Sequence, residues 1–168
     1  MDLPEYATPA TEPPAARLRR WLDAAEQAGQ PNHTAMALST LDQTGSPRTM
    51  FVLCKGITET GINFYTNLES DKGVEIARDP RVSVAFYWAA TGRQVRLEGV
   101  LAPLPDNEAD AYFASRGRLS KVGAWASDQS RPVRSREVLV AAVESVAARF
   151  PDEVPRPPHW SGFHLRAD

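Results

Sequence analysis

Cysteine is almost absent from this sequence, and several other features that define protein classes are missing. The single cysteine, Cys54, has no partner for an intrachain disulfide, and the chain opens with no secretory signal pattern. Both observations favour a reducing, cytoplasmic setting. No apolar run approaches the roughly 20 residues needed to cross a bilayer. The 19 Lys and Arg do not exceed the 21 Asp and Glu, which argues against a general nucleic-acid or membrane-surface binder.

The sequence also lacks the common signatures of phosphate-binding loops, dinucleotide-binding glycine loops and serine hydrolases. The histidines His33, His159 and His164 are far apart and have no cysteine partners, so we expect no zinc site. Cys54 lies in an apolar run, where a cysteine is more often a buried small hydrophobe than a nucleophile. These patterns assign no catalytic residue.

What is present indicates a mainly β protein with flanking helices. The 168 residues suffice for one domain with a sizeable core. We expect a flexible, proline-rich tail over residues 1–14 and a single domain over 15–168. Apolar spacing predicts helices over 15–28, 70–78, 107–115 and 135–150. Alternating or β-branched runs predict strands over 34–41, 49–54, 62–66, 82–88, 93–104 and 159–165, which together favour an antiparallel barrel or sandwich.

Two of these segments carry a marked apolar face. Val82, Val84, Phe86 and Trp88 alternate along one strand and predict a buried side. The last predicted helix carries a broad apolar stripe composed of Val138, Leu139, Ala142, Val143, Val146 and Phe150.

The segment 115–121 gathers three cations and two hydroxyls around Gly117. Arginine forks and hydroxyl donors suit phosphate oxygens, so one interpretation is an anion-binding loop. The other is a solvated basic loop, which composition alone favours. Gln94 lies in mid-strand, where a polar amide usually points to solvent. Residues 129–131 form a polar turn before Ser135, a predicted helix cap.

Eight short segments, taken in order, resemble the pyridoxamine 5′-phosphate oxidase family over Leu18 to Arg166. They are PNHTAM at 31–36, VLCK at 52–55, FYTNLES at 64–70, RQVR at 93–96, YFASR at 112–116, GAWAS at 123–127, QSR at 129–131 and PRPPHWSGF at 155–163. The resemblance implies an FMN-binding split β-barrel that forms a homodimer with its active sites at the interface. It also implies oxidation of pyridoxamine or pyridoxine 5′-phosphate to pyridoxal 5′-phosphate, in which a hydride passes to the flavin and dioxygen becomes hydrogen peroxide. Because the flavin carries the redox chemistry, no catalytic triad is required.

The family's ligands map residue by residue onto this chain. For the substrate phosphate they are Lys55, Tyr112, Arg116 and Ser120. For FMN they are Val52, Leu53, Tyr65, Thr66, Lys72, Gln94, Gln129 and Ser130.

Three departures from the family pattern concern the cofactor and the substrate. Met50 stands where the family has an arginine that reaches the FMN phosphate, and Asp71 stands where it has a second arginine. We expect weaker FMN binding, since one lost charge-assisted bond costs about 1.5–3 kcal/mol. The sequence ends at Asp168, whereas the family continues with a flavin-contacting Trp and a substrate-contacting Arg-x-His.

Two other functions fit the same resemblance. One is a protein of this fold that binds pyridoxal 5′-phosphate or a flavin without turnover. The other is a reductase that uses a different flavin-like cofactor, such as a deazaflavin.

Overall fold

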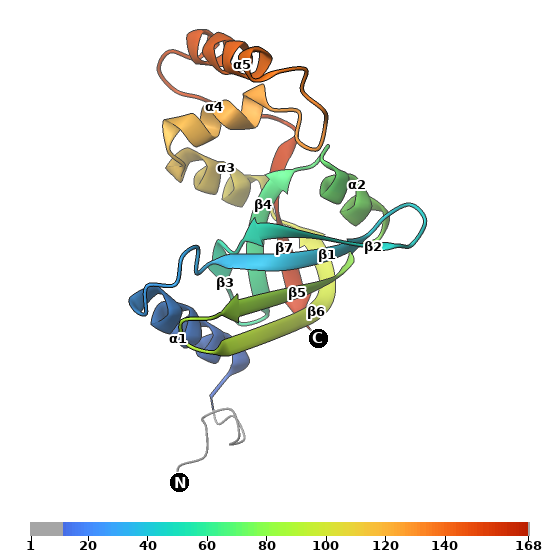
Figure 1. The fold of residues 1–168 in the computed structure, drawn as a ribbon, viewed down its shortest axis with the longest axis vertical. Helices are drawn as coiled ribbons and strands as arrows, with labels where there is room; N and C mark the ends of the chain where they lie inside the picture. The colour runs from blue at the N-terminus through green and yellow to red at the C-terminus, as the bar shows by residue number, and fades with distance from the viewer. Residues whose placement is uncertain (1–11, 168) are drawn as a thin grey trace.

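The computed structural model describes residues 12–167, which form one strongly curved sheet with helices at its two ends (Figure 1). The strand order is β2-β1-β5-β6-β7-β4-β3, and every neighbouring pair is antiparallel. The strands are β1 (Ala35–Leu41), β2 (Pro47–Leu53), β3 (Gly56–Ile57), β4 (Gly61–Asn67), β5 (Arg81–Trp88), β6 (Arg93–Pro103) and β7 (Trp160–Ala167). The predicted mainly β architecture is confirmed.

The core lies inside the curve of the sheet, where alternate residues of each strand meet. In β5 the predicted face of Val82, Val84, Phe86 and Trp88 is buried, which confirms the alternation. Met36 and Leu38 of β1 and Ile62 and Phe64 of β4 pack against that face within the same core. Strand periodicity therefore sets which side chains are excluded from water.

Helix α1 (Pro14–Gln27) closes one end of the curved sheet (Figure 1). Its residues Leu18, Trp21 and Ala25, spaced three and four apart, are buried in the core. The helix starts one residue earlier than predicted, with Pro14 in its first turn, a position that suits proline. Residues 1–11 of the predicted tail lie outside the described residues.

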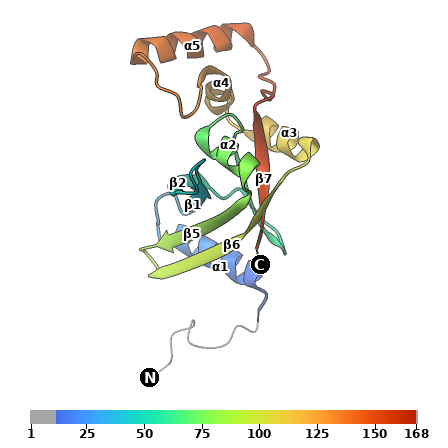
Figure 2. The same ribbon diagram turned by 90° about the vertical axis from the view of Figure 1, so that its right-hand side faces the viewer.

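The other helices lie toward the opposite end of the sheet (Figure 2). They are α2 (Asp71–Arg78), α3 (Asp106–Ser115), α4 (Arg118–Ala126) and α5 (Arg136–Arg149). The Ser70 hydroxyl accepts a hydrogen bond from the Gly73 N–H at 3.3 Å and caps α2, and Ser135 caps α5 as predicted. None of the described helices combines the length and the apolar character needed to cross a bilayer.

Helix α4 differs from the sequence expectation, which made residues 115–121 a loop. Arg116 adopts an extended conformation with ψ 147°, which ends α3, and Gly117 then caps a new helix. Strand β3, which spans only two residues, is a second unpredicted element.

Helix α5 carries its predicted apolar stripe, but no residue of α5 is buried in this chain. Val138 is 50% exposed and Leu139 is 38% exposed. The reason is position: α5 packs on α4 beyond the end of the sheet, and not on the sheet itself (Figure 2).

Candidate functional site

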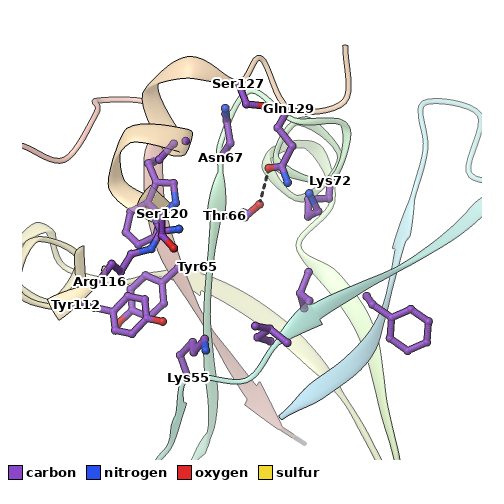
Figure 3. A pocket seen from close by; sticks show the side chains of 16 residues that line it. Lys55, Tyr65, Thr66, Asn67, Lys72, Tyr112, Arg116, Ser120, Ser127 and Gln129 are labelled. Carbon is purple, nitrogen blue, oxygen red and sulfur yellow. Dashed lines mark hydrogen bonds between the residues drawn. The ribbon is translucent and has the colours of Figure 1, made fainter. Parts of the chain in front are cut away.

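A cavity of about 450 Å³ lies between β2, β4 and the helices α2, α3 and α4 (Figure 3). Its volume is in the range of small-molecule sites. It gathers ten of the twelve ligand residues inferred from the resemblance, although they come from separate segments of the chain. These ten are Val52, Leu53, Lys55, Tyr65, Thr66, Lys72, Tyr112, Arg116, Ser120 and Gln129.

The other two inferred ligands lie outside the residues that line this cavity. Gln94 is exposed on β6, where it pairs with Tyr87 of β5. Ser130 follows Gln129 in a turn that is closed by a hydrogen bond from the Arg131 N–H to the Asp128 carbonyl at 3.0 Å. Its φ of 69° lies in the left-handed region, which is uncommon for a residue other than glycine.

Arg116 occupies the break between α3 and α4, with its guanidinium directed to the cavity. The guanidinium carbon lies 5.4 Å from the Phe113 ring centroid, and it also lies over the Trp160 ring. Nη1 is buried and has no hydrogen-bond partner among the described residues. Burial lowers the pKa of Arg116 from its ordinary value. A buried guanidinium nitrogen without a partner is costly, so this position favours an anionic ligand.

An aromatic wall stands beside Arg116. The ring centroids of Tyr65 and Tyr112 are 4.0 Å apart with planes 13° from parallel, and Tyr65 and Trp160 are 5.3 Å apart at 6°. Burial raises the pKa of Tyr65, with a smaller contribution from Glu108, so its hydroxyl stays protonated. The register pairs Tyr65 with Gly162, and this glycine leaves room for the ring.

Lys72 forms a second cationic position, in the first turn of α2. The residue is only 7% exposed, and its Nζ donates to the Ser70 hydroxyl at 3.3 Å. Burial lowers the pKa of Lys72, against the opposing influence of Asp71 and Glu75. Nearby, the Thr66 hydroxyl donates to Oε1 of Gln129 at 3.4 Å. The start of α2, where Ser70 already caps the Gly73 N–H, adds the partial positive charge of the helix dipole.

The charge of the cavity is of one sign. Lys55, Lys72 and Arg116 line it, and no carboxylate does among residues 12–167. Figure 3 shows Arg116, Ser120 and Tyr112 on one side of β4 and Lys72 with Gln129 on the other. The arrangement therefore suits a ligand or ligand pair with anionic groups at two ends.

Met50 and Asp71, the two substitutions that depart from the family pattern, lie outside the cavity lining. Met50 is partly buried against the core. Asp71 is paired, since its carboxylate contacts Arg131 at 2.7 Å and Arg48 at 3.6 Å. These partners offset the negative charge that Asp71 would otherwise present to a nearby phosphate.

Trp160 is the main lining residue that sequence reasoning does not single out. Its one signal is its place in the PRPPHWSGF segment that carries part of the resemblance. Cys54, by contrast, is buried as predicted, and burial raises its pKa. Over the described range, no group of His, Cys, Asp and Glu is arranged to hold a metal ion.

The fold is that of the FMN-binding split β-barrels. The structure is similar to a pyridoxamine 5′-phosphate oxidase-related, FMN binding protein from Nostoc punctiforme, with a TM-score of 0.71 and 16% identity over 99% of this chain and 83% of the other. PhzG from Burkholderia lata 383, solved in complex with tetrahydrophenazine-1-carboxylic acid, gives a TM-score of 0.89. It is 31% identical over 99% of this chain and 82% of its own.

The sequence comparisons are more specific. Residues 22–150 match the family model described as pyridoxamine 5′-phosphate oxidase. A pyridoxine/pyridoxamine 5′-phosphate oxidase from Anaeromyxobacter dehalogenans is 50% identical over 97% of this chain and 81% of its own length. Another, from Alkalilimnicola ehrlichii, is 52% identical over 84% of this chain and 74% of its length. The chain belongs to the pyridoxamine 5′-phosphate oxidase family.

Proposed function

We propose that this chain is an FMN-dependent oxidoreductase that converts pyridoxamine or pyridoxine 5′-phosphate to pyridoxal 5′-phosphate, with dioxygen as the electron acceptor. Relatives that carry this name are about 50% identical over most of the chain, which supports the assignment. The free, buried thiol of Cys54 supports the cytoplasm as the place of action.

The observation that carries the proposal is the buried Nη1 of Arg116, which has no hydrogen-bond partner among residues 12–167. Tyr112, Ser120 and Lys55 line the same cavity, so hydroxyl and ammonium donors surround the place where a phosphate would lie. A phosphate monoester is nearly a dianion at neutral pH and requires several donors at once. The role proposed for these four residues is to hold the substrate phosphate and thereby orient the ring attached to it.

The other half of the cavity fits FMN. Lys72 and the N-terminus of α2 offer a cation and backbone N–H groups to a phosphate, while Gln129 and Thr66 offer polar contacts to the flavin. When bound, FMN would accept a hydride from the substrate and reduce dioxygen to hydrogen peroxide. The protein's task is then to bind, orient and exclude water, for which the aromatic wall of Tyr65, Tyr112 and Trp160 is suited.

The proposed assembly is a homodimer in which Gln94 contacts the cofactor in the partner's cavity. The strand register places Phe51, Ala37 and Ala85 in one row across β2, β1 and β5. Tyr87 and Gln94 follow on the same face, because directly paired residues of antiparallel strands share a face. Phe51 at the cavity rim is 78% exposed and Tyr87 is 67% exposed. This strip of exposed aromatic and small side chains, which runs from the cavity to Gln94 and borders Arg96, supports a subunit contact there.

The test is to titrate FMN into the apo protein and then assay pyridoxal 5′-phosphate and hydrogen peroxide from each phosphorylated vitamer. The proposal expects FMN binding and stoichiometric formation of both products. Binding of pyridoxal 5′-phosphate without turnover would establish the binding-protein alternative. Activity with a deazaflavin alone would establish the reductase alternative, and either result would overturn the proposal.

A second candidate substrate is a flat ring that carries a carboxylate. The likeness to PhzG, at 31% identity and a TM-score of 0.89, favours this candidate, since that protein binds tetrahydrophenazine-1-carboxylic acid. The stacked rings and the cations suit either anion. Parallel assays with phosphorylated vitamers and with reduced phenazine carboxylates separate the two.

A further inference from the structure

An ion pair that the proposed chemistry does not use anchors the turn at residues 128–131 to α2. Nη1 of Arg131 donates to the Asp71 carboxylate at 2.7 Å, and Nη2 donates to the Glu69 carbonyl at 3.3 Å. The guanidinium of Arg48 on β2 lies 3.6 Å from the other Asp71 oxygen. Asp71 therefore connects three segments that are distant in sequence: β2, α2 and the turn between α4 and α5.

The anchored turn carries Gln129, whose side chain forms part of the cavity wall (Figure 3). The bond from Thr66 to Gln129 is long at 3.4 Å, so it holds the side chain only weakly. The bond between Arg131 and Asp128 closes the turn but does not fix its place relative to β4. The contacts of Arg131 with Asp71 of α2 and with Glu69 just before it supply that missing constraint.

We propose that Asp71 is a positioning residue: through Arg131 it holds the 128–131 turn against the start of α2 and so sets Gln129 at the FMN side of the cavity. The inference rests on the proposed function for its ligand. It reverses the simplest view of Asp71, in which an anion beside a phosphate site only repels the ligand. The two views predict opposite signs when the charge is removed.

The experiment is an FMN titration of the full-length apo protein and its variants. For Asp71→Asn we expect the Kd to rise about three- to tenfold, because a half-exposed ion pair that holds a segment contributes modestly. Asp71→Arg should bind more weakly still, since it sets a third cation beside Arg131 and Arg48. Adding Arg131→Asp to Asp71→Arg should then tighten binding again, because the pair is restored with its charges exchanged.

Simple repulsion makes the contrary prediction at each step. Asp71→Asn and Asp71→Arg would tighten FMN binding, and the added Arg131→Asp would weaken it. Unchanged or tighter binding by Asp71→Asn, or no recovery in the exchanged pair, overturns the proposal. The matched control is Arg134→Gln, which removes a cation from the same segment between α4 and α5. This variant should bind FMN like wild type.

A second readout does not depend on the flavin. Hydrogen–deuterium exchange of the peptide that covers residues 127–134 should accelerate in apo Asp71→Asn and Arg131→Met but not in Arg134→Gln. If wild type fails to bind FMN, the proposed function fails while this readout still decides the role of Asp71. If wild type binds FMN and the exchange rates do not differ, the positioning role alone is wrong.

Discussion

The guanidinium carbon of Arg116 lies 4.8 Å from the centroid of the Trp160 ring. This cation–π contact orients the guanidinium but satisfies none of its N–H donors. Trp160 begins β7, and Arg116 ends α3, so two segments distant in sequence meet at this point. The contact leaves Arg116 directed to the cavity with a donor free for an anion.

Replacing Arg116 should separate phosphorylated from unphosphorylated ligands. We expect Arg116→Ala to weaken pyridoxal 5′-phosphate binding by about 2–5 kcal/mol, because it removes a desolvated charged donor. Pyridoxal, which lacks the phosphate, should bind nearly as before, and Arg116→Lys should lie between. Calorimetric titration of both ligands measures the difference. An equal loss of binding free energy for the two ligands would show that Arg116 does not recognise the phosphate.

Lys72 should show a trade of stability against cofactor binding. Lys72→Met removes a buried charge, so we expect the free energy of unfolding of the apo protein to rise. Each kcal/mol of added stability should raise the melting temperature by about 2–4 °C. The same change removes a cation from the proposed phosphate site, so the Kd for FMN should rise about tenfold to a hundredfold. Thermal melts and FMN titrations report the two effects, and an unchanged Kd would exclude Lys72 from the FMN site.

The lowered pKa of Lys72 also fixes the sign of a pH effect. Between its folded-state pKa and the ordinary value of 10.5, the unfolded chain binds more protons at this residue than the folded chain. The stability of the apo protein should therefore rise with pH across that window, relative to Lys72→Met. The difference between the two melting curves, followed from neutral pH to pH 10, tests this sign; a constant difference contradicts it.

Shared active sites should permit two inactive variants to complement each other. In a mixed dimer of Gln94→Ala and Arg116→Ala, one cavity receives both defects and the other receives none. Random reassortment of the two variants should therefore restore about a quarter of wild-type activity. Light scattering should give a mass of two chains. Activity that stays at the level of the separate variants would show that Gln94 does not serve the partner's cavity.

Gly162 should be required for the aromatic wall. A Cβ at this position would lie 2.6 Å from Tyr65 ring atoms and 2.7 Å from the Leu104 side chain, so the ring must shift. We expect Gly162→Ala to cost about 1–3 kcal/mol of stability and to weaken ligand binding. Near-ultraviolet circular dichroism should report the disturbed stack. Gly117→Ala is the control for the spectrum only, because a Cβ there meets nothing within 4 Å but the residue caps α4.

Local periodicity accounts for what the sequence predicts well. The alternation in β5 and the spacing in α1 are repeated several times within one element, so the buried faces can be identified without tertiary information. Strand β3 has two residues and no period to detect. Helix α4 is not predicted because it buries only Val122 and so has no apolar period. Gly117 before it and Gly123 within it are residues typical of loops.

The cavity depends on long-range contacts that no local pattern encodes. The family resemblance predicts which residue types line the cavity. It does not predict that Asp71 pairs with Arg131, because the two residues are 60 positions apart in the chain. The exposure of α5 is likewise set by where the helix packs. An apolar stripe indicates that a face can be buried, but not against which surface.

The pairing of β4 with β7 has a consequence for the order of folding. Tyr65 and Gly162 are register partners although nearly a hundred residues separate them, whereas β1 and β2 form a hairpin with a short turn. During synthesis the β1–β2 hairpin and the β5–β6 pair can form early. The edge of β4 that pairs with β7 stays unpaired until β7 has been synthesised. Trp160 arrives with β7, so the binding cavity is completed only after β7 has left the ribosome. Until then the β4 edge is unpaired, which makes nascent chains stalled before β7 the species most exposed to misassembly.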